Sequence, residues 1–518
     1  MRASATWKQA YWSADVIPDP ATDRHPESAA KHGFGKWLEP PPLRVLESRS
    51  YYPWLVVGTV CIGAFMGQVD ASIAQLVLPE LRSAFHAPIS SVAWVSIAYL
   101  LVVTVMLPIV GRLADMLGRK LLYCSGFIVF VIGSALCGLA PDLETLIGAR
   151  VLQALGASLL QANSVAIIVT IAGEARRGRA LGLQSAAQAV GLSAGPALGG
   201  FLISTLGWQW VFWINVPAGL LGAALGLLVL PRTERSGNTG WFDFGGAFLL
   251  APALALLVYA LNQVGRTEIN SPQLIAPVAA GLVMLTGFIH HELRSRSPLI
   301  DPDLFRNAGF VAGNLAGLLS YAILFGAFFV LPFVLERVYG ESSLISGLRL
   351  TAIPVALGLL APLSGAFSDR LGARLLTVAG MLVVLASLLL LSYLLGSGAG
   401  HLLALTALLA LLGAGQGLFT APNNSAVMGA AAAADTGEAG GLLNVMRSLG
   451  MSFGISLASV ILSLQLPEVP GQPLMMELPA ADVGRGAAMS FLAFGALALL
   501  AALLSLVRSD HRQRDAAD

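Results

Sequence analysis

The chain alternates between long apolar runs and short polar segments. Each apolar run extends over about 20 residues or more, which is the length that crosses a bilayer as an α-helix. The runs do not alternate apolar and polar residues with a period of two, as the strands of a membrane β-barrel do. The pattern predicts an all-α polytopic membrane protein with fourteen transmembrane helices, at residues 53–79, 90–113, 120–140, 143–172, 178–204, 210–230, 243–263, 272–292, 308–336, 343–368, 375–396, 401–428, 438–465 and 487–508.

Composition narrows the class further. Of the 518 residues, 56% are hydrophobic and 11% are charged, and the mean hydropathy is +0.76. Soluble proteins have about a quarter charged residues, so this chain has too little charge to cover a soluble surface of its size. The net charge of +1 gives no overall field to attract nucleic acid, so we expect the lipid bilayer as its surroundings and no nucleic-acid partner. The cysteines Cys61, Cys124 and Cys137 lie inside apolar runs without metal-ligand spacing, which predicts membrane packing and no metal site.

Basic residues are unevenly distributed among the polar segments. An even number of spans places both termini on one side of the membrane, and segments rich in Lys and Arg face the cytoplasm. One alternate set of segments is rich in them, which predicts that both termini are cytoplasmic; the acidic segment 435–438 is the exception. We expect a multi-pass protein of the cell (inner) membrane. The polar tails are residues 1–50, expected to be disordered, with a short amphipathic surface segment at 36–50 as the alternative, and residues 511–518. The rich set holds Arg112, Arg119, Lys120, Arg176, Arg177, Arg179, Arg232, Arg235, Arg294, Arg296, Arg306, Arg370 and Arg374, and the other set holds Arg82, Arg266, Arg337 and Arg485.

One polar segment recurs. The stretch GRLADMLGRK at 111–120 returns in degraded form as GAFSDRLGAR at 365–374, each time after the second helix of a block of six. The repeat predicts a six-helix bundle at 51–230, two extra helices at 231–300 and a second six-helix bundle at 301–510. Parallel six-helix halves are typical of transporters that rock about a substrate site between the halves, near mid-membrane.

Five motifs together resemble the major facilitator superfamily and, more narrowly, its fourteen-helix drug:proton antiporter family, over about residues 53–508. They are GRLADMLGRK at 111–120, RVLQALGAS at 150–158, GLSAGPALGG at 191–200, VDASIAQLVLPEL at 69–81 and WQWVFWINVPAG at 208–219. The resemblance implies the superfamily's fold and export of small molecules in exchange for protons, by alternating access.

The chain departs from the family pattern at several places. Gln209 stands where the family usually has Arg, and Gln75 stands where it usually has Asn. The spans at 343–368, 375–396 and 401–428 lack the additional carboxylate that several relatives carry. These departures leave the number of protons and the charge of the substrate open.

The loop motif combines charge with glycine. Gly111 and Gly118 remove side chains that would block the approach of two helices, and we expect Asp115 near a helix N-terminus, where the dipole favours an anion. The resemblance implies that this loop, with Arg119 and the matching Asp369 and Arg370, clamps the cytoplasmic face between the halves. The alternative is a basic topology anchor with ordinary turn chemistry, and both roles are compatible.

Asp70 lies in the middle of the first predicted helix. A carboxylate in lipid is costly unless it is paired, hydrated or protonated, so such residues are functional by default. We predict a proton carrier, with a structural ion pair or a substrate counter-charge as alternatives. Arg150 is its candidate partner, because the resemblance implies that this residue faces the first helix. Burial favours the protonated form of Asp70 and a nearby Arg favours its carboxylate form, so a substrate that weakened the contact between Asp70 and Arg150 would change proton binding. The alternative for Arg150 is an interfacial side chain that extends to the membrane surface.

The fifth predicted helix carries Gly191, Gly195, Pro196 and Gly199. The spacing of four residues between glycines allows close helix approach, and the proline bends the helix. The resemblance implies a bend that seals an antiporter against leak, and generic tight packing is the alternative.

Polar side chains within the spans outline a candidate substrate cavity with few charges, which suits amphipathic, largely apolar molecules. For any single member, a hydrogen bond between helices is an equally good interpretation. The candidates are Gln68, Gln161, Asn163, Gln184, Gln188, Asn215, Asn314, Gln416, Asn423, Asn424 and Asn444, with Arg447 as a cation for an anionic substrate, an outer gate or a structural pair.

The leading functional hypothesis is therefore proton-coupled export of drugs, toxic compounds or secondary metabolites. A narrow-substrate metabolite or osmolyte carrier is the alternative, followed by a membrane-embedded enzyme or a sensor. We find no catalytic arrangement and no nucleotide-binding loop, so we predict neither an enzyme nor a cofactor. The residues 290–292, His-His-Glu, predict an interfacial polar cap in preference to a metal site. Substrate, protons and lipid are the expected partners of a monomer, and a periplasmic adaptor with an outer-membrane channel remains open.

Overall fold

The computed structural model describes residues 41–173, 176–232, 243–264, 271–295, 302–397, 401–431, 436–465 and 479–507. Within these ranges every long element is an α-helix, and 13 helical segments are long and apolar enough to cross a membrane. The remaining predicted span coincides with α12, whose apolar stretch Gly245–Leu261 is shorter. The prediction of an all-α polytopic membrane protein is confirmed.

The helices follow the predicted spans in order. After the short α2 (Arg44–Glu47), the first six spans contain α3 (Tyr52–Leu76), α4 (Leu78–Phe85), α5 (Ile89–Val92), α6 (Trp94–Leu117), α7 (Arg119–Gly138), α8 (Leu143–Ala172), α9 (Arg177–Leu206), α10 (Trp210–Trp213) and α11 (Asn215–Val229). The two extra spans are α12 (Phe244–Gln263) and α13 (Pro272–Glu292). The last six contain η3 (Pro302–Arg306), α14 (Ala308–Arg337), α15 (Ser343–Leu350), α16 (Ala352–Leu371), α17 (Ala373–Gly396), α18 (Leu402–Ala430), α19 (Thr436–Gln465) and α20 (Ala480–Leu506).

Three predicted spans are divided into two helices just before a proline. Pro79 lies in the first turn of α4, Pro217 in the first turn of α11 and Pro354 in the first turn of α16. Proline has no backbone N–H and is tolerated in the first turn of a helix, where that donor is not needed. The apolar span continues across the breaks before Pro217 and Pro354, which is why hydropathy alone does not reveal them, whereas α4 is more polar and contains Glu80 and Arg82.

The start of the last span and the end of the N-terminal tail differ from the prediction. The last span begins at Ala480 and not at 487, since Pro479 is the N-cap residue of α20 and Asp482 lies in the first turn, where the helix dipole favours an anion. The predicted disordered tail extended to residue 50, yet Leu43 N–H donates to the Leu228 carbonyl at 3.0 Å and α2 follows. Residues 1–40 and 508–518 lie outside the described residues.

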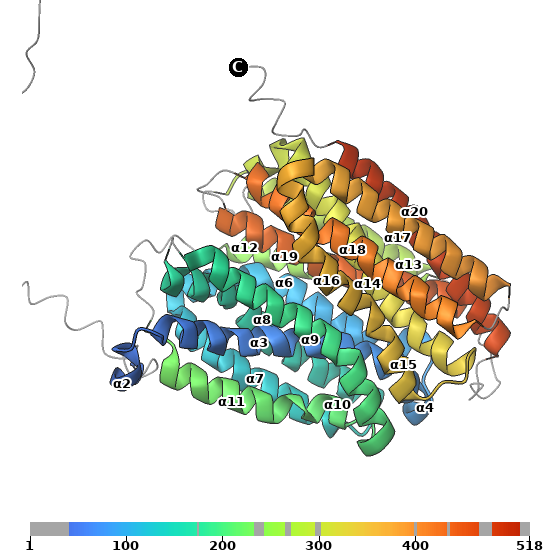
Figure 1. Ribbon diagram of the computed structural model, residues 1–518, viewed down its shortest axis with the longest axis horizontal. Coiled ribbons are helices and arrows are strands. Elements are labelled where there is room, and N and C mark those ends of the chain that lie inside the picture. The colour runs from blue at the N-terminus through green and yellow to red at the C-terminus, as the bar shows by residue number, and fades with distance from the viewer. Residues whose placement is uncertain are drawn as a thin grey trace, which may run out of the picture. The chain divides into compact units, whose positions relative to one another are not determined.

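The helices pack mainly within the two predicted sets of six. In the first set α3 packs on α9 and α8 packs on α6 and α7; in the second set α14 packs on α19, α16 on α18 and α17 on α20 (Figure 1). The extra helices α12 and α13 pack on each other, and α12 also contacts α6 and α19. The described residues from 41 to 507 form one compact unit, so the three-part division stays a prediction within it.

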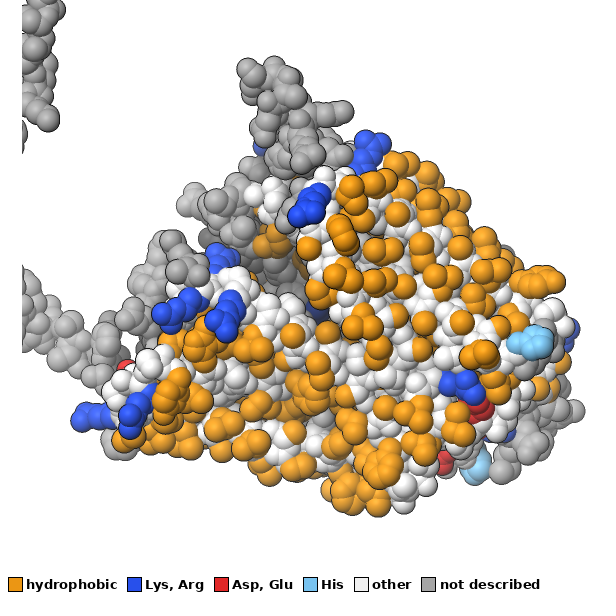
Figure 2. All heavy atoms as spheres, viewed as in Figure 1, with side chains coloured by type: hydrophobic (Ala, Val, Ile, Leu, Met, Phe, Trp, Pro, Cys, Tyr) orange, Lys and Arg blue, Asp and Glu red, His pale blue; other side chains and the backbone are white. Residues whose placement is uncertain are grey.

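The surface fits a protein surrounded by lipid. Figure 2 shows hydrophobic side chains over most of the visible face, along the length of the helices. Most of the visible Lys and Arg side chains gather at the end of the helices where α2 lies. This arrangement is the one expected when that end meets the negatively charged cytoplasmic face.

The two copies of the repeated motif have the same backbone at their turns. Gly118 joins α6 to α7 with φ 111° and ψ 130°, and Gly372 joins α16 to α17 with φ 84° and ψ 145°. These positive φ values are strained for residues with a side chain, so both turns require glycine. The repeat seen in the sequence therefore corresponds to a repeated turn geometry.

Candidate functional site

The carboxylate of Asp70 is held by three donors from two other helices. Arg150 Nη1 donates to Asp70 Oδ2 at 2.7 Å, while Gln153 Nε2 and Asn215 Nδ2 donate to Oδ1 at 2.9 and 3.1 Å. Asp70 is 0% exposed and Arg150 is 1% exposed. The structure thus brings Asp70 and Arg150 together as a buried ion pair, with two amide donors completing the coordination of the acid.

Close helix packing positions the arginine and its neighbours. Gly133 on α7 faces the backbone of Gln153 on α8, and a Cβ on this glycine would lie 2.5 Å from the Gln153 Cα. Arg150 Nε donates to the Val95 carbonyl of α6 at 3.1 Å. The guanidinium Cζ also lies 4.2 Å from the centre of the Tyr99 ring, a distance typical of a cation–π contact. The side chain of Arg150, which belongs to α8, is therefore held against α3 and α6.

An internal cavity of about 50 Å³ lies beside this ion pair. A water molecule needs roughly 10–15 Å³ of such space, so the cavity has room for a few waters or a small chemical group. Tyr99 belongs to both places, because its ring contacts Arg150 and also lines the cavity. The lining residues are Gly63, Ala64, Gly67, Gln68, Ala71, Tyr99, Leu100, Val103, Phe130, Ala157, Leu160, Gln161, Ser164, Gln188, Arg447, Ser448 and Met451.

A second, smaller cavity of about 10 Å³ lies among α14, α18 and α19. Asn314, Asn423 and Asn424 line it, and Arg447 borders both cavities. Of the predicted cavity residues, Gln68, Gln161 and Gln188 thus share the larger cavity, and Arg447 connects it to the asparagines.

Five predicted cavity residues line neither of these two cavities: Asn163, Gln184, Asn215, Gln416 and Asn444. Asn163 is buried outside both cavities, and its Nδ2 donates to the Leu159 carbonyl at 2.7 Å. Asn215 lines neither cavity and instead holds Asp70. Asn163 thus makes a hydrogen bond within α8 and Asn215 makes one between helices, which is the alternative interpretation of such residues, and their place in a substrate cavity stays a prediction.

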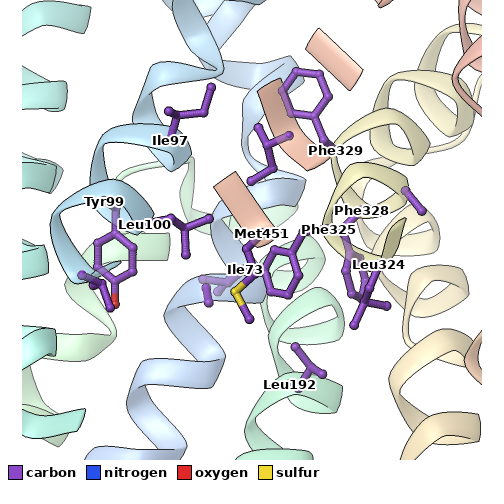
Figure 3. Packing of buried hydrophobic residues seen from close by; sticks show 14 of the residues in the cluster. Ile73, Ile97, Tyr99, Leu100, Leu192, Leu324, Phe325, Phe328, Phe329 and Met451 are labelled. Atoms are coloured by element: carbon purple, nitrogen blue, oxygen red, sulfur yellow. The ribbon is translucent and has the colours of Figure 1, made fainter. Parts of the chain in front are cut away.

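An apolar cluster joins the two sets of helices next to the larger cavity. Ile73 of α3, Leu192 of α9, Phe325 of α14 and Met451 of α19 are all buried in it (Figure 3). Ile73 follows the cavity-lining Ala71 on α3. Met451 belongs to both places, because it lies in the cluster and also lines the cavity.

The glycine-rich motif GLSAGPALGG at 191–200 lies on α9 and packs closely against two other helices, α3 and α15. A Cβ on Gly191 would lie 2.6 Å from the Phe65 carbonyl oxygen, and a Cβ on Gly199 would lie 2.7 Å from Ile73 Cγ1, both on α3. Gly195 faces Ser72 of α3 in the same way. Pro196 contacts the second set of helices, since its carbonyl oxygen occupies the space that a Cβ on Gly347 of α15 would need. The motif therefore packs α9 against α3 and against α15, while its role as a seal stays a prediction.

The loop motif is described only in part. Gly118 makes the turn, but a Cβ on Gly111 would meet nothing within 4 Å, so the expected close approach at that residue is wrong for this conformation. Asp115 lies in the last turn of α6, shortly before Gly118, the N-cap residue of α7. The side chains of Asp115 and Asp369 lie outside the described residues, so the predicted clamp stays a prediction.

The basic residues of the motif have separate surroundings. Arg119 is the first residue of α7, and Arg370 is exposed near the end of α16. Lys120 is buried, and its Nζ donates to the carbonyls of Leu227 and Leu230 at 3.0 and 2.6 Å. Lys120 therefore caps the C-terminal end of α11, where the helix dipole favours a cation.

The sequence analysis did not place three residues beside Asp70 and Arg150. Gln153 was present in the RVLQALGAS motif and Asn215 in the WQWVFWINVPAG motif, but neither was linked to Asp70. Tyr99 lies in a continuous apolar run and had no distinguishing signal. Contacts across 83 and 145 residues depend on how each helix is rotated, which a single sequence does not define.

Charged groups at the ends of helices have ordinary structural roles. Asp142 is the N-cap residue of α8, and the backbone N–H of Thr145 donates to its carboxylate at 2.8 Å, which lowers the pKa of Asp142. His291 Nε2 lies 2.6 Å from Asp243 Oδ1, at the ends of α13 and α12. Among the described residues no group of three His, Cys, Asp or Glu could hold a metal ion.

Comparison with known proteins identifies the family. The model of the Major Facilitator Superfamily matches residues 60–455 and 314–517. The chain is 32% identical over 406 residues to the riboflavin transporter RibZ of Clostridioides difficile (strain 630), covering 78% of this chain and 87% of that protein. It is 32% identical over 454 residues to the multidrug resistance protein B homolog of Mycobacterium tuberculosis (strain ATCC 25618 / H37Rv), covering 85% of this chain and 84% of that protein.

The fold is also found among solved structures. A bacterial homolog of the human lysosomal transporter Spinster, in an inward-facing and unoccupied conformation, matches with a TM-score of 0.65 and 14% identity, covering 89% of this chain and 97% of that one. At that identity the likeness concerns the fold alone. Together with the family match, it confirms the resemblance carried by the five motifs, and the chain belongs to the major facilitator superfamily of membrane transporters.

Proposed function

We propose that the chain exports small amphipathic molecules across the cytoplasmic membrane in exchange for protons, with both termini in the cytoplasm. The observation that carries the proposal is the fully buried Asp70, paired with Arg150 beside a cavity that faces both sets of helices. A titratable acid in the middle of a membrane span is the simplest proton carrier that the fold offers. Similarity to a multidrug resistance protein supports the substrate class.

The geometry suggests how proton and substrate are coupled. A proton on Asp70 removes the negative charge that holds the Arg150 guanidinium at 2.7 Å. A substrate in the cavity contacts Tyr99, whose ring lies against the same guanidinium. Because both events act on Arg150, binding of substrate changes the proton affinity of Asp70. Alternating access then exchanges substrate and proton across the membrane.

A second candidate is a carrier for one metabolite. One observation favours it, the similarity to a riboflavin transporter. Riboflavin therefore belongs among the compounds tested.

The test uses proteoliposomes with an imposed pH gradient. Lipophilic compounds and riboflavin are added one at a time while proton movement is followed with a pH-sensitive dye, for the native protein, Asp70→Asn and the control Asp142→Asn. The control removes an exposed carboxylate but keeps a good N-cap side chain. Because Asp70→Asn leaves Arg150 without its counter-charge, the neutral double variant Asp70→Asn/Arg150→Gln is measured as well.

The outcomes separate the candidates. Proton movement triggered by several compounds, lost in both Asp70 variants and kept in the control, supports the proposal. Movement that persists without Asp70 assigns the proton to another group. If no compound moves protons while one solute still equilibrates down its own gradient, the exporter proposal is wrong and the carrier for one metabolite takes its place.

A further inference from the structure

Arg447 is a cation that the proposed coupling does not use. It lies on α19 and borders both cavities. Its Nε is buried and makes no hydrogen bond, and its Cζ lies 5.9 Å from the centre of the Tyr321 ring. An Arg that reached the membrane surface would keep its guanidinium in water, so a buried Nε beside two cavities indicates an inward-facing side chain. Burying a guanidinium donor without a partner costs free energy, and this cost is recovered when an acceptor arrives.

The larger cavity offers donors and lacks acids. Gln161 Nε2 is also buried without a hydrogen bond, so two unpartnered donor groups, Gln161 and Arg447, belong to the same lining. Among the described residues that line either cavity there is no Asp or Glu. An Arg side chain has only donors and keeps its charge in proteins, so the arrangement lacks an acceptor with negative charge.

The neighbouring acid does not supply that charge. Asp70 already accepts from Arg150, Gln153 and Asn215, and it does not line the cavity. The ion pair is neutral as a whole, so the cavity keeps the positive charge of Arg447.

We propose that Arg447 binds the anionic head group of the transported molecule, a carboxylate or a sulfonate, with Gln161 as a further donor. This proposal rests on the proposed export function and narrows its substrates to amphipathic organic anions. Phe130, Met451 and Leu100 supply the apolar wall for the rest of the molecule. An engineered cavity that accepts benzene has about 150 Å³, so the 50 Å³ present here fits a head group, and the apolar part enters as the helices separate.

The test compares three probes that share one ring system: 2-naphthoate, the neutral 2-naphthamide and 2-naphthyl-trimethylammonium. Their affinities are measured by titration calorimetry on the full chain in lipid nanodiscs, with empty nanodiscs subtracted. The variants are Arg447→Gln, Arg447→Lys and the control Arg485→Gln, which removes an exposed arginine near the start of α20. Thermal unfolding establishes that each variant is folded.

We expect the native protein to bind 2-naphthoate about 10- to 100-fold more tightly than 2-naphthamide, since a hydrogen bond to a charged group has roughly that effect. The preference should fall to about one in Arg447→Gln, persist in part in Arg447→Lys and be unchanged in Arg485→Gln. A native protein that binds the three probes equally or prefers the cation overturns the proposal, and so does an Arg447→Gln variant that keeps the preference. If Arg447→Gln does not fold, the native comparison and the Arg447→Lys variant still decide.

This binding experiment is independent of transport. If the protein prefers the anion but no compound moves protons in proteoliposomes, the role of Arg447 stands and the proposed proton exchange is wrong. If neutral or cationic compounds move protons as well as anions do, the proton exchange stands and the role of Arg447 is wrong.

Discussion

Replacing Asp70 by Asn tests whether the buried ion pair is as tightly constrained as its geometry indicates. The carboxylate accepts three hydrogen bonds, one from Arg150 and two from the amides of Gln153 and Asn215. An asparagine has one acceptor oxygen and one NH₂ group. If its oxygen faces Arg150, the NH₂ group faces two amide donors. If its oxygen faces the amides, the NH₂ group faces the guanidinium.

Either orientation leaves Arg150 as a buried charge without a counter-charge. Arg150 is 1% exposed and remains protonated, so it is not relieved by water or by losing a proton. Breaking a buried pair by removing one partner costs about 3–5 kcal/mol. We therefore expect the free energy of unfolding of Asp70→Asn to fall by about this amount, a roughly 10²- to 10⁴-fold change in the folding equilibrium.

The matching variants give a thermodynamic cycle. Arg150→Gln should cost less than Asp70→Asn, because an unpaired carboxylate can bind a proton while an arginine stays charged. The double variant Asp70→Asn/Arg150→Gln should be more stable than Asp70→Asn alone, since it leaves no buried charge.

The assay is reversible unfolding of the four proteins in one detergent, with Asp142→Asn as the control for loss of an acid outside the core. If the losses of the two single variants add in the double variant to within about 0.5 kcal/mol, the side chains do not interact and the reasoning from the ion pair fails.

Three further predictions concern the scaffold. Gly347→Ala should lower the free energy of unfolding by about 1–3 kcal/mol, because the added methyl group overlaps the Pro196 carbonyl of the facing helix α9. The control Gly58→Ala adds a methyl group that meets nothing within 4 Å, so this variant should be as stable as the native protein or more stable in thermal unfolding. Equal effects of the two substitutions would contradict the close approach at Gly347. Lys120→Met should cost about 1.5–3 kcal/mol in the same assay, since two helix-end carbonyls lose a charged donor; an unchanged melting temperature would refute the cap. The backbone N–H of Thr145 lowers the pKa of Asp142, so the contribution of this carboxylate to stability is present at neutral pH and is lost as the pH falls through the lowered pKa. Asp142→Asn should therefore weaken the loss of stability in acid, which is measured as the melting temperature against pH.

Much of the fold is predictable from the sequence because a membrane helix is defined by length and apolar content alone. All fourteen predicted spans coincide with helices. The breaks before Pro217 and Pro354 were not predicted, since each lies inside one continuous apolar span. A hydropathy pattern records the environment of a residue and not the backbone hydrogen bonds that a proline removes.

The site was predictable only where a charge stands out from lipid. Asp70 and Arg150 could be singled out because each is unusual in an apolar run. Asn215 could not be assigned, since an amide inside a span fits a cavity or a hydrogen bond equally well, and only the rotation of α11 decides. Gly111 shows the opposite error, because a glycine beside a charged motif looked like a close approach, yet the space around it is open.

The separation of the ion-pair residues along the chain has a consequence for biosynthesis. Arg150 follows Asp70 by 80 residues and Asn215 follows it by 145. At about 5–20 residues per second, a ribosome needs roughly 7–30 s to make the last of these donors after the acid has been made. During this interval α3 resides in the membrane with an acid that costs about 2.5–3.5 kcal/mol at the centre of a helix. The apolar remainder of α3 must therefore keep the nascent span inserted until α8 and α11 arrive, so substitutions that make α3 more polar should reduce the yield of inserted protein before they affect transport.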